Sequence, residues 1–452
     1  MREEIANRAE FLNRLFREGE FSFSSGMIDD LKFPDIAEVI GGLEREYRLE
    51  FFSSLDLGIK AEIIPMLDRG IVRDLLEVLD TGEIASFVNR MASDDAADMI
   101  NLLPPEKVHL VLERISRRDY RDLIALLRFD EESAGGIMAR EFLVVEKGIT
   151  IAEATGIVRD QSKLIEHLHN LYIVDSEGVL LGSVPVISLI TEEPDTVVSE
   201  VMNTDIERVT VDVDQEKVAA IFRKYDLYSL AVVDGRGKLV GRITVDDIID
   251  IIEEEANEDI SHLVGTGEAE FWQKSPIKLS KSRMPWLITG LAGGIAVAVI
   301  MNSFRDALES IISLAFFVPV IMAMGGNVGI QSSAIVVREL ATEEFTFVET
   351  GRKIFRELKV SLINGSILGL LLFIVVFLWF RDFSLGILVG SCLLFIVIWA
   401  TFIGTAVPLL FHRMNVDPAL ATGPFITTFN DIMGVLVYLA MATAMLRWVM
   451  AA

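Results

Sequence analysis

Long uncharged windows, separated by short charged segments, occupy the last third of the chain. Four of them are Met284–Phe304, Ser310–Val337, Val360–Phe380 and Phe383–Phe411. A fifth window, Pro418–Leu446, is interrupted only by Asp431. Because roughly 20 helical residues cross the hydrocarbon core of a bilayer, each window predicts a membrane-spanning helix. The alternative, a soluble core of five apolar helices, is disfavoured because soluble helices normally keep one polar face.

Residues 55–130 show a different pattern, with short amphipathic stretches that follow acidic or proline-containing start signals. These signals recur at a nearly constant interval and lie at Asp68, Asp80, Ser93-Asp94, Pro104-Pro105-Glu106 and Asp119. Short capped helices at a constant period are typical of a small α-superhelix. We find no catalytic constellation in this segment.

An internal repeat follows the helical segment. Leu168–Gly178 aligns with Leu227–Gly237, and the match continues to Ile190 and Ile249. Each copy predicts a helix, a strand, an Asp-x-x-Gly turn, a second strand and a second helix. The repeat is therefore a tandem α/β pair, and it resembles a CBS (Bateman) module.

CBS modules can bind adenosine nucleotides through a Thr or Ser and an Asp that follow the second strand. The second copy has Thr244 and Asp247, whereas the first copy has Pro185 and Ser188 at the aligned positions. Half of the usual signature is missing, so the resemblance implies at most weak binding of an adenine nucleotide.

One acidic helix is predicted after the second copy. Its carboxylates are Asp246, Asp247, Asp250, Glu253, Glu254, Glu255, Glu258 and Asp259. Lys and Arg are absent from Asp246 to Gln273, and positions 247, 250, 254 and 258 share one helical face, where their charges repel. This pattern favours an external counter-charge, either divalent cations or a basic partner, with a solvated acidic face as the alternative. Oxygen ligands without a Cys or His cluster favour Mg²⁺ or Ca²⁺ over zinc or copper.

Charge divides the 452-residue chain into two physically different parts, although its averages are 51% hydrophobic residues and a mean hydropathy of +0.44. From Lys281 onward, 11 Lys and Arg face 10 Asp and Glu, whereas residues 1–280 carry 30 against 57, a net charge of −27. So acidic a domain excludes nucleic acid as a partner. The single Cys392 excludes a disulfide framework and a cysteine-based zinc site. No apolar stretch follows Met1, so we expect no cleavable signal peptide.

Basic residues are distributed unevenly between the two ends of the predicted spans. If the N-terminus is inside, the inner side holds nine: Lys278, Lys281, Arg283, Arg338, Arg352, Lys353, Arg356, Lys359 and Arg413. The outer side then holds only Arg305, Arg381 and Arg447. The positive-inside rule therefore predicts a cytoplasmic N-terminus and places the acidic segment 1–280 in the cytosol.

Two polar features lie inside the predicted spans. Residues 325–333, Gly-Gly-Asn-Val-Gly-Ile-Gln-Ser-Ser, follow Pro319 and predict loosened backbone, which is tolerated only where protein or water satisfies it. Asp431 is the other, and a carboxylate near mid-membrane costs roughly 2.5–3.5 kcal/mol unless it faces water or a cation. It is a functional candidate, with a structural contact to a neighbouring helix as the alternative. Gly293-Gly294 and Gly365–Gly369 are expected to be helix-packing contacts.

Four signatures taken together resemble the MgtE family of magnesium channels and transporters over nearly the full length. They are Glu132–Met138 (Glu-Ser-Ala-Gly-Gly-Ile-Met), Val245-Asp246-Asp247 through Glu258-Asp259-Ile260, Gly325-Gly326-Asn327 with Gln331-Ser332, and Val416–Ala419 with Pro424 and Asp431. The resemblance implies a multidomain protein. The expected parts are an all-α superhelical N-terminal domain (1–135), an α/β tandem CBS pair (136–199 and 200–256), an acidic connecting helix and linker (246–280), and a five-helix α transmembrane pore domain (281–452).

The resemblance also implies a homodimer whose pore is lined by the second and fifth membrane helices, with Asp431 selecting hydrated Mg²⁺. Because Mg²⁺ dehydrates reluctantly, carboxylates and carbonyls can recognise its water shell. The cytosolic domains are implied to sense Mg²⁺, which bridges carboxylates and closes the pore when it is abundant. Matching sensor positions are Glu62, Asp94, Asp98, Gly136 through its carbonyl, Asp214, Glu216, Asp226, Asp247, Asp250, Glu255, Glu258, Asp259 and Asp417.

The expected function is a Mg²⁺-selective, Mg²⁺-gated channel or transporter for uptake, a multi-pass protein of the cell membrane and not an enzyme. Mg²⁺ is both its substrate and its regulatory ligand. Val328 and Ile330 depart from the family, which has Thr and Asn there. No phosphate-binding loop is present, which argues against an ATP-driven pump. One alternative is a secondary transporter of another solute, such as Co²⁺ or an anion, with adenylate control through the CBS pair, although no Lys or Arg lies within the spans. Another is a membrane-anchored regulator in which Asp431 is dispensable.

Overall fold

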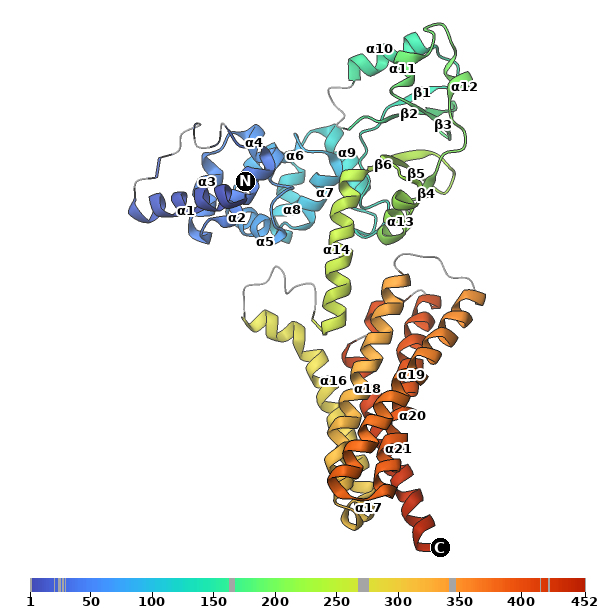
Figure 1. Ribbon diagram of the computed structural model, residues 1–452. Helices are drawn as coiled ribbons and strands as arrows, with labels where there is room; N and C mark the ends of the chain where they lie inside the picture. Colours follow the sequence, from blue (N-terminus) through green and yellow to red (C-terminus); the bar gives the residue numbers. More distant parts are fainter. Residues whose placement is uncertain are drawn as a thin grey trace. The chain divides into compact units, whose positions relative to one another are not determined.

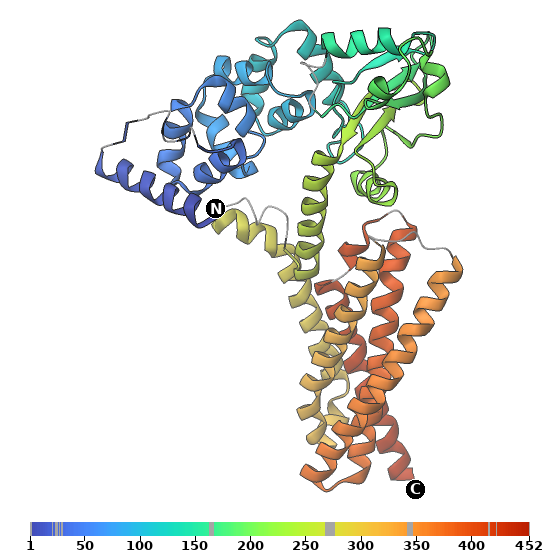
Figure 2. The same cartoon turned by 45° about the horizontal axis from the view of Figure 1, so that its top comes forward.

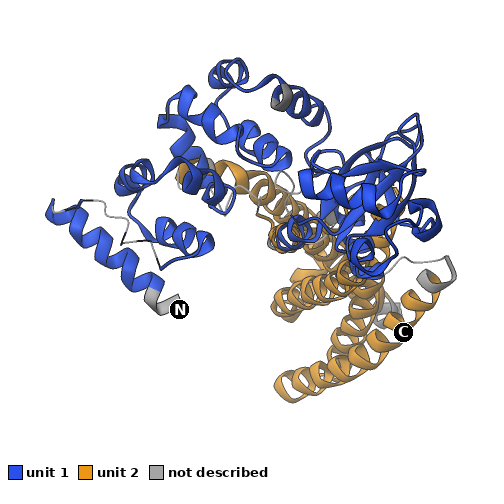
Figure 3. Ribbon diagram, turned by 90° about the horizontal axis from the view of Figure 1, so that it is seen from above, with its two compact units in different colours: residues 1–253 blue, residues 254–452 orange. Residues whose placement is uncertain are grey.

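The chain forms two compact units in the computed structural model, residues 1–253 and residues 254–452 (Figure 3). The structure describes residues 2–19, 21–22, 26, 28, 30–161, 167–266, 276–340, 347–414, 416–421 and 423–451. The boundary between the units falls inside one helix, α14 (Val245–Val264), which carries the acidic run.

Short helices make up the N-terminal part of the first unit (Figure 1). After α1 (Arg2–Glu18), residues 33–126 form α2 (Phe33–Gly42), α3 (Arg45–Ser54), α4 (Leu57–Ile63), α5 (Arg69–Val78), α6 (Thr81–Val88), α7 (Ser93–Asn101), α8 (Pro105–Leu112) and α9 (Arg117–Leu126). From α2 to α9 the helix starts are evenly spaced along the chain. The predicted α-superhelix is confirmed and extends further toward the N-terminus than the sequence pattern indicated. The last helix already begins at Arg117, before Asp119, which the sequence offered as its start.

Local chemistry explains where these helices begin. Asp68 and Asp80 are the N-cap residues of α5 and α6, and their carboxylates accept hydrogen bonds from Gly70 N at 2.8 Å and Gly82 N at 2.7 Å. Pro105 is the first residue of α8, where its missing N–H costs nothing. Each helix buries one apolar face in a continuous core, so the regular period arises from repeated core positions, with capping side chains at α5 and α6.

Two small sheets of the same topology follow. They consist of β1 (Val144–Glu146), β2 (Asn170–Val174) and β3 (Leu180–Pro185), and of β4 (Arg208–Thr210), β5 (Ser229–Val233) and β6 (Leu239–Thr244). In each sheet the first strand is parallel to the second, and the second is antiparallel to the third. The helices of this part are α10 (Ile151–Gln161), α11 (Ser188–Thr191), α12 (Val198–Val201) and α13 (Gln215–Tyr225). The tandem α/β pair is confirmed, whereas β1 and β4 were not predicted.

The two Asp-x-x-Gly turns are built alike. Asp175 Oδ1 accepts hydrogen bonds from the backbone N–H groups two and four residues later, at 2.8 and 2.9 Å, and Asp234 Oδ1 does the same at 2.8 and 2.9 Å. Gly178 and Gly237 adopt positive φ angles of 85° and 79°, which favour glycine. The repeated motif therefore encodes a turn, and it carries no ligand chemistry of its own.

Long apolar helices form the second unit (Figure 2). They are α16 (Pro276–Ser303), α18 (Ser313–Leu340), α19 (Phe347–Phe380), α20 (Phe383–Arg413) and α21 (Pro424–Ala451), with the short α17 (Arg305–Ser310) and the 3₁₀ helix η3 (Pro418–Ala421) between them. Among the described residues, five helices are long and apolar enough to cross a membrane, at Leu279–Ser303, Ser313–Leu340, Gly351–Phe380, Phe383–Arg413 and Pro424–Arg447. The five predicted membrane helices are therefore confirmed.

One prediction for the membrane helices is wrong. Residues 325–333 do not interrupt α18, which is a continuous helix through all three glycines. The glycines serve close packing instead: a Cβ at Gly326 would lie 3.1 Å from Thr427 Cγ2 of α21. Glycine at membrane depth can either loosen a helix or let another helix approach, and here the second use holds. Gly365 and Gly369 pack as predicted, because a Cβ at each would lie 2.9 Å from Leu394 and 2.6 Å from Gly390 O of α20. Gly293 also packs, against Thr428 of α21, but the prediction is wrong for Gly294, where nothing lies within 4 Å of a Cβ.

Candidate metal centres

Asp431 lies in the first third of α21 and is half-buried. The preceding residue, Asn430, donates a hydrogen bond from Nδ2 to Gly325 O of α18 at 3.3 Å. These two helices are the second and the fifth candidate spans. The structure therefore packs the glycine-rich stretch of α18 against Asn430, the residue that precedes Asp431.

Asn327 and Gln331 of α18 are one helical turn apart and exposed in the single chain, within the apolar span. Val328, one of the two departures from the family pattern, is partly buried and packs against the apolar core of the membrane helices. The apolar side chain at this position therefore belongs to the packing of this chain. The polar side chains of Asn327 and Gln331, close to Val328 on the same helix, remain exposed.

The C-terminal half of α14 carries a cluster of ionisable groups. His262 Nε2 lies 3.1 Å from Glu258 Oε1 and 3.8 Å from Asp417 Oδ2. Burial, Asp417 and Glu258 raise the pKa of Asp259 to about 6. The hydrogen bond with Glu258, followed by the charge of Asp417, raises the pKa of His262. Three predicted sensor residues thus meet here.

A second pair of predicted sensor residues meets within the first unit. The pKa of Asp94, at the start of α7, is raised well above its usual value by burial and then by the charge of Asp247. Burial likewise raises the pKa of Asp247, whose Oδ2 accepts a hydrogen bond from the Thr244 hydroxyl at 2.7 Å. The pKa of Asp250 is raised by burial and by Glu253. The first unit therefore holds carboxylates whose ionised forms are destabilised.

Two residues near these clusters were missed by sequence reasoning. Glu141 accepts a hydrogen bond from the Ser93 hydroxyl at 2.7 Å and adds negative charge near Asp94. His262 pairs with Glu258, one helical turn earlier on the same helix. The i,i+4 spacing could have identified His262, because side chains at that spacing are neighbours on a helix. No local pattern could have identified Glu141, which is far from Ser93 in the sequence.

Several other predicted ligands have local structural roles. Asp214 is the N-cap residue of α13 and accepts a hydrogen bond from Glu216 N at 3.0 Å. Asp226 ends the same helix with a positive φ of 51°. A Cβ at Gly136 would lie 2.7 Å from the backbone oxygen of Glu131, so glycine is required in that turn. Glu62, Asp98 and Glu216 are exposed, and Glu255 is half-buried on α14.

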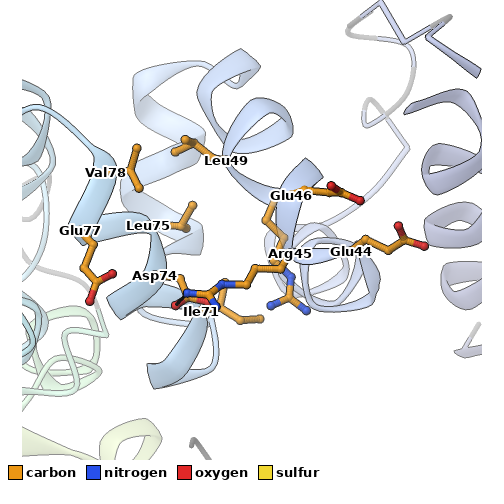
Figure 4. Close-up of a pocket in the computed structure, with 10 residues that line it drawn as sticks. Glu44, Arg45, Glu46, Leu49, Ile71, Asp74, Leu75, Glu77 and Val78 are labelled. Carbon is orange, nitrogen blue, oxygen red and sulfur yellow. Dashed lines mark hydrogen bonds and ion pairs between the residues drawn. The ribbon is translucent and has the colours of Figure 1, made fainter. Parts of the chain in front are cut away.

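In the described part of this single chain, no three His, Cys, Asp or Glu side chains form a group that could hold a metal ion. A surface pocket of about 520 Å³ lies between α3 and α5, where Arg45 and Asp74 form an ion pair at 2.7 Å (Figure 4). None of the predicted ligands lines this pocket. The predicted sensor residues therefore come together as pairs and small clusters, not as one complete coordination site.

Family models match three segments of the chain. The model described as a divalent cation transporter, MgtE, matches residues 318–441, the MgtE intracellular N domain matches residues 31–132, and the CBS domain matches residues 198–254. The N-domain match includes α2 to α9, and the transporter match includes Asp431.

Two similar proteins bear the name of the matching transporter family, MgtE. The magnesium transporter MgtE of Thermus thermophilus is 36% identical over 332 residues, which cover 73% of this chain and 74% of that protein. The magnesium transporter MgtE of Enterococcus faecalis is 35% identical over 323 residues, which cover 72% and 71%.

Two of the solved structures that resemble this chain come from magnesium transport proteins. The crystal structure of the soluble part of a magnesium transporter has a TM-score of 0.50 at 26% identity and covers 57% of this chain and 100% of that chain. The cytosolic domain of the Mg²⁺ channel MgtE in complex with ATP has a TM-score of 0.50 at 28% identity and covers 54% and 99%. With the N domain, the CBS domain and the transporter region in one chain that also carries five apolar helices, this multi-pass membrane protein belongs to the MgtE family of magnesium transporters.

Proposed function

We propose that this protein conducts Mg²⁺ passively along a pathway lined by α18 and α21, with Asp431 as the carboxylate that selects the hydrated ion. The observation that carries the proposal is the position of Asp431, half-buried on α21 directly after Asn430, which bonds to Gly325 O of α18. A carboxylate at this depth is retained where it faces water or a cation. A membrane potential supplies about 2.3 kcal/mol per elementary charge per 100 mV, and twice that for a divalent ion, so no chemical energy source is needed.

The pathway is proposed to lie between two copies of the chain, with the N-termini in the cytoplasm. Asn327 and Gln331 support this arrangement, because they are exposed in the single chain within an apolar span. Polar side chains in a membrane normally face protein or water rather than lipid. A second copy would cover them and enclose a water-lined passage.

The cytosolic part is proposed to sense intracellular Mg²⁺ and to close the pathway. Asp94 with Asp247, and Asp259 with Asp417, hold carboxylates whose ionised forms are disfavoured by burial and like charge. Bound Mg²⁺ would remove this repulsion, and its remaining ligands would come from other domains or a second copy. The oxygen-rich donor set suits Mg²⁺, and we propose the predicted sensor residues as its ligands. We also propose the domain boundaries that the sequence predicts.

An adenine nucleotide is proposed as a weak ligand of the CBS pair. The ATP complex of a related cytosolic domain supports this proposal. Weak binding is expected because the first copy has Pro185 and Ser188, and because Thr244 and Asp247 already bond to each other at 2.7 Å. Transport of another divalent cation such as Co²⁺, under adenylate control, is the alternative function.

Flux measurements in proteoliposomes test the pathway. Asp431→Ala should reduce Mg²⁺ flux to background while the protein still assembles, because the selecting charge is lost. The matched control is Asp306→Ala, which removes an exposed carboxylate outside the candidate spans. Unchanged flux in Asp431→Ala at equal protein content would remove the pore assignment. A higher Co²⁺ flux than Mg²⁺ flux in the wild type would favour the alternative.

A further inference from the structure

Asn430, the residue before Asp431, is a polar side chain buried inside the membrane domain. Only 1% of it is exposed. Its Nδ2 donates to Gly325 O, which joins α21 to α18. Its Oδ1 is buried and has no hydrogen-bond partner among the residues that the structure describes.

The amide of Asn430 occupies a space that exists because residue 329 is glycine. A Cβ at Gly329 would overlap Asn430 Nδ2 and would lie 2.7 Å from Ile426 Cγ2. On the other side of the same turn, a Cβ at Gly404 of α20 would overlap Gly329 O and lie 3.1 Å from Ser332 Cβ. Two helices, α20 and α21, therefore pack tightly against one turn of α18, and the Asn430 amide fills the space on the α21 side.

Stability alone gives no reason for an amide at this position. A buried carbonyl oxygen without a donor costs free energy, and an apolar side chain of similar size would avoid that cost. The hydrogen bond to Gly325 O recovers only the donor half of the amide. The amide adds a directional interaction, because a hydrogen bond fixes the rotation of α21 about its own axis more tightly than an apolar contact does.

We propose that Asn430 is a positioning residue, whose contacts with Gly325 O and the Gly329 turn set the rotation of α21 and thereby the direction of the Asp431 carboxylate. Successive side chains on an α-helix project about 100° apart, so fixing Asn430 on α18 directs Asp431 to a neighbouring face of the helix. The inference rests on the proposed role of Asp431 in the ion pathway. It adds that selection depends on how this carboxylate is held as well as on its charge.

The test compares Asn430→Ala and the milder Asn430→Ser with the wild type in proteoliposomes, per amount of folded protein. The readouts are the Mg²⁺ concentration at half-maximal flux and the ratio of Mg²⁺ to Ca²⁺ flux. Loss of an interhelical hydrogen bond of this kind should raise the half-saturating concentration or lower the ratio by about three- to tenfold. Gly329→Ala, which displaces the amide without removing it, should shift the same readouts in the same direction.

Matched controls separate this effect from general damage. Asn101→Ala removes an exposed amide at the end of α7, outside the candidate spans, and Gly294→Ala adds a methyl group to α16 where nothing lies within 4 Å. Both should leave the two readouts unchanged. If Asn430→Ala fails to assemble, the same two readouts measured on Asn430→Ser test the proposal.

Each result separates this inference from the proposed function. If Asp431→Ala abolishes flux while the Asn430 variants keep the wild-type half-saturation and ion ratio, the positioning role is wrong and the pore assignment stands. A lower yield of folded protein with both readouts unchanged would also overturn it, because that is a purely structural effect. If Asp431→Ala conducts normally, the pore assignment fails and the positioning role fails with it.

Discussion

Several carboxyl groups in this protein have raised pKa values, because they are buried and lie near other carboxylates. Asp259 is the clearest case, because burial, Asp417 and Glu258 all disfavour its ionised form, and only His262 opposes them. Ionising Asp259 therefore costs free energy, and a bound divalent cation would offset this cost by stabilising the carboxylate. The same reasoning applies to Asp94, whose neighbours include Asp247 and Asp95.

The raised pKa of Asp259 predicts a pH dependence in the metal-free protein. Its folded pKa of about 6 lies above the ordinary 3.8, so the folded state holds a proton that the unfolded chain releases. This contribution to stability is full below about pH 4 and is lost as the pH rises through about 6. In EDTA, amide hydrogen exchange of α14 should therefore be slower at pH 5 than at pH 7, after correction for intrinsic exchange rates.

Asp259→Asn isolates this effect from His262, whose pKa is also raised and whose charge acts in the same direction. The variant should flatten part of the pH dependence and leave a remainder that belongs to His262, Asp247 and Asp250, whose pKa values are also raised. Equal pH dependence in the variant and the wild type would show that Asp259 ionises freely, which contradicts the prediction.

Among the elements, α14 has the most direct link to the proposed regulation, because it carries predicted sensor residues along its length. It runs for 20 residues, begins after β6 beside the Asp94–Asp247 pair, and ends with the His262 cluster. The unit boundary falls between Glu253 and Glu254, so one continuous helix belongs to both units. A helix transmits displacement along its axis only while its backbone hydrogen bonds are intact.

Breaking α14 near its middle should uncouple sensing from conduction. Proline inside a helix costs about 3 kcal/mol and kinks or ends it. Ala256→Pro should therefore keep Mg²⁺ flux but lose its inhibition by cytosolic Mg²⁺, measured in inside-out patches or oriented vesicles. Ala256→Ser is the matched control and should keep normal inhibition. Full inhibition in Ala256→Pro would mean that a straight α14 is unnecessary for closure.

Element by element, the sequence was most informative where a local pattern sets the structure. Caps such as Asp68 and the apolar windows predicted helices that the structure contains. Short strands such as β1 have too few positions for an alternating pattern to be visible. The glycines of α18 were misread because a sequence does not say whether another helix approaches them. Glu141 was missed because its role depends on a distant contact.

At the scale of the whole molecule, the main feature is the unequal distribution of charge between the two parts of the chain. Residues 1–280 carry a net charge of −27, and residues 281–452 carry a net charge of +1. Asp431 could be selected from the sequence because a single charge in a long apolar window is conspicuous. The proposed metal sites could not be assembled from the sequence, because their carboxylates come from separate elements, and in the described part of the single chain they meet only as pairs and small clusters.

If the acidic part senses Mg²⁺ as proposed, millimolar Mg²⁺ should compact residues 1–265 of the intact chain. Bridging cations cancel the repulsion between carboxylates, whereas monovalent salt only screens it. Limited proteolysis should therefore cut residues 1–265 more slowly in Mg²⁺ than in NaCl of equal ionic strength. Asp247→Asn with Asp259→Asn should weaken the protection. Equal cleavage in Mg²⁺ and in NaCl would refute the proposed sensor.

The constant spacing of helix starts from α2 to α9 also bears on how this domain can change its length. An in-frame duplication or deletion of one period would add or remove a whole helix, and every later cap and core position would keep its register. Insertions of other sizes would shift polar residues into the core. The helical domain can therefore grow or shrink by recombination in steps of one helix, with the membrane portion of the gene left unaltered.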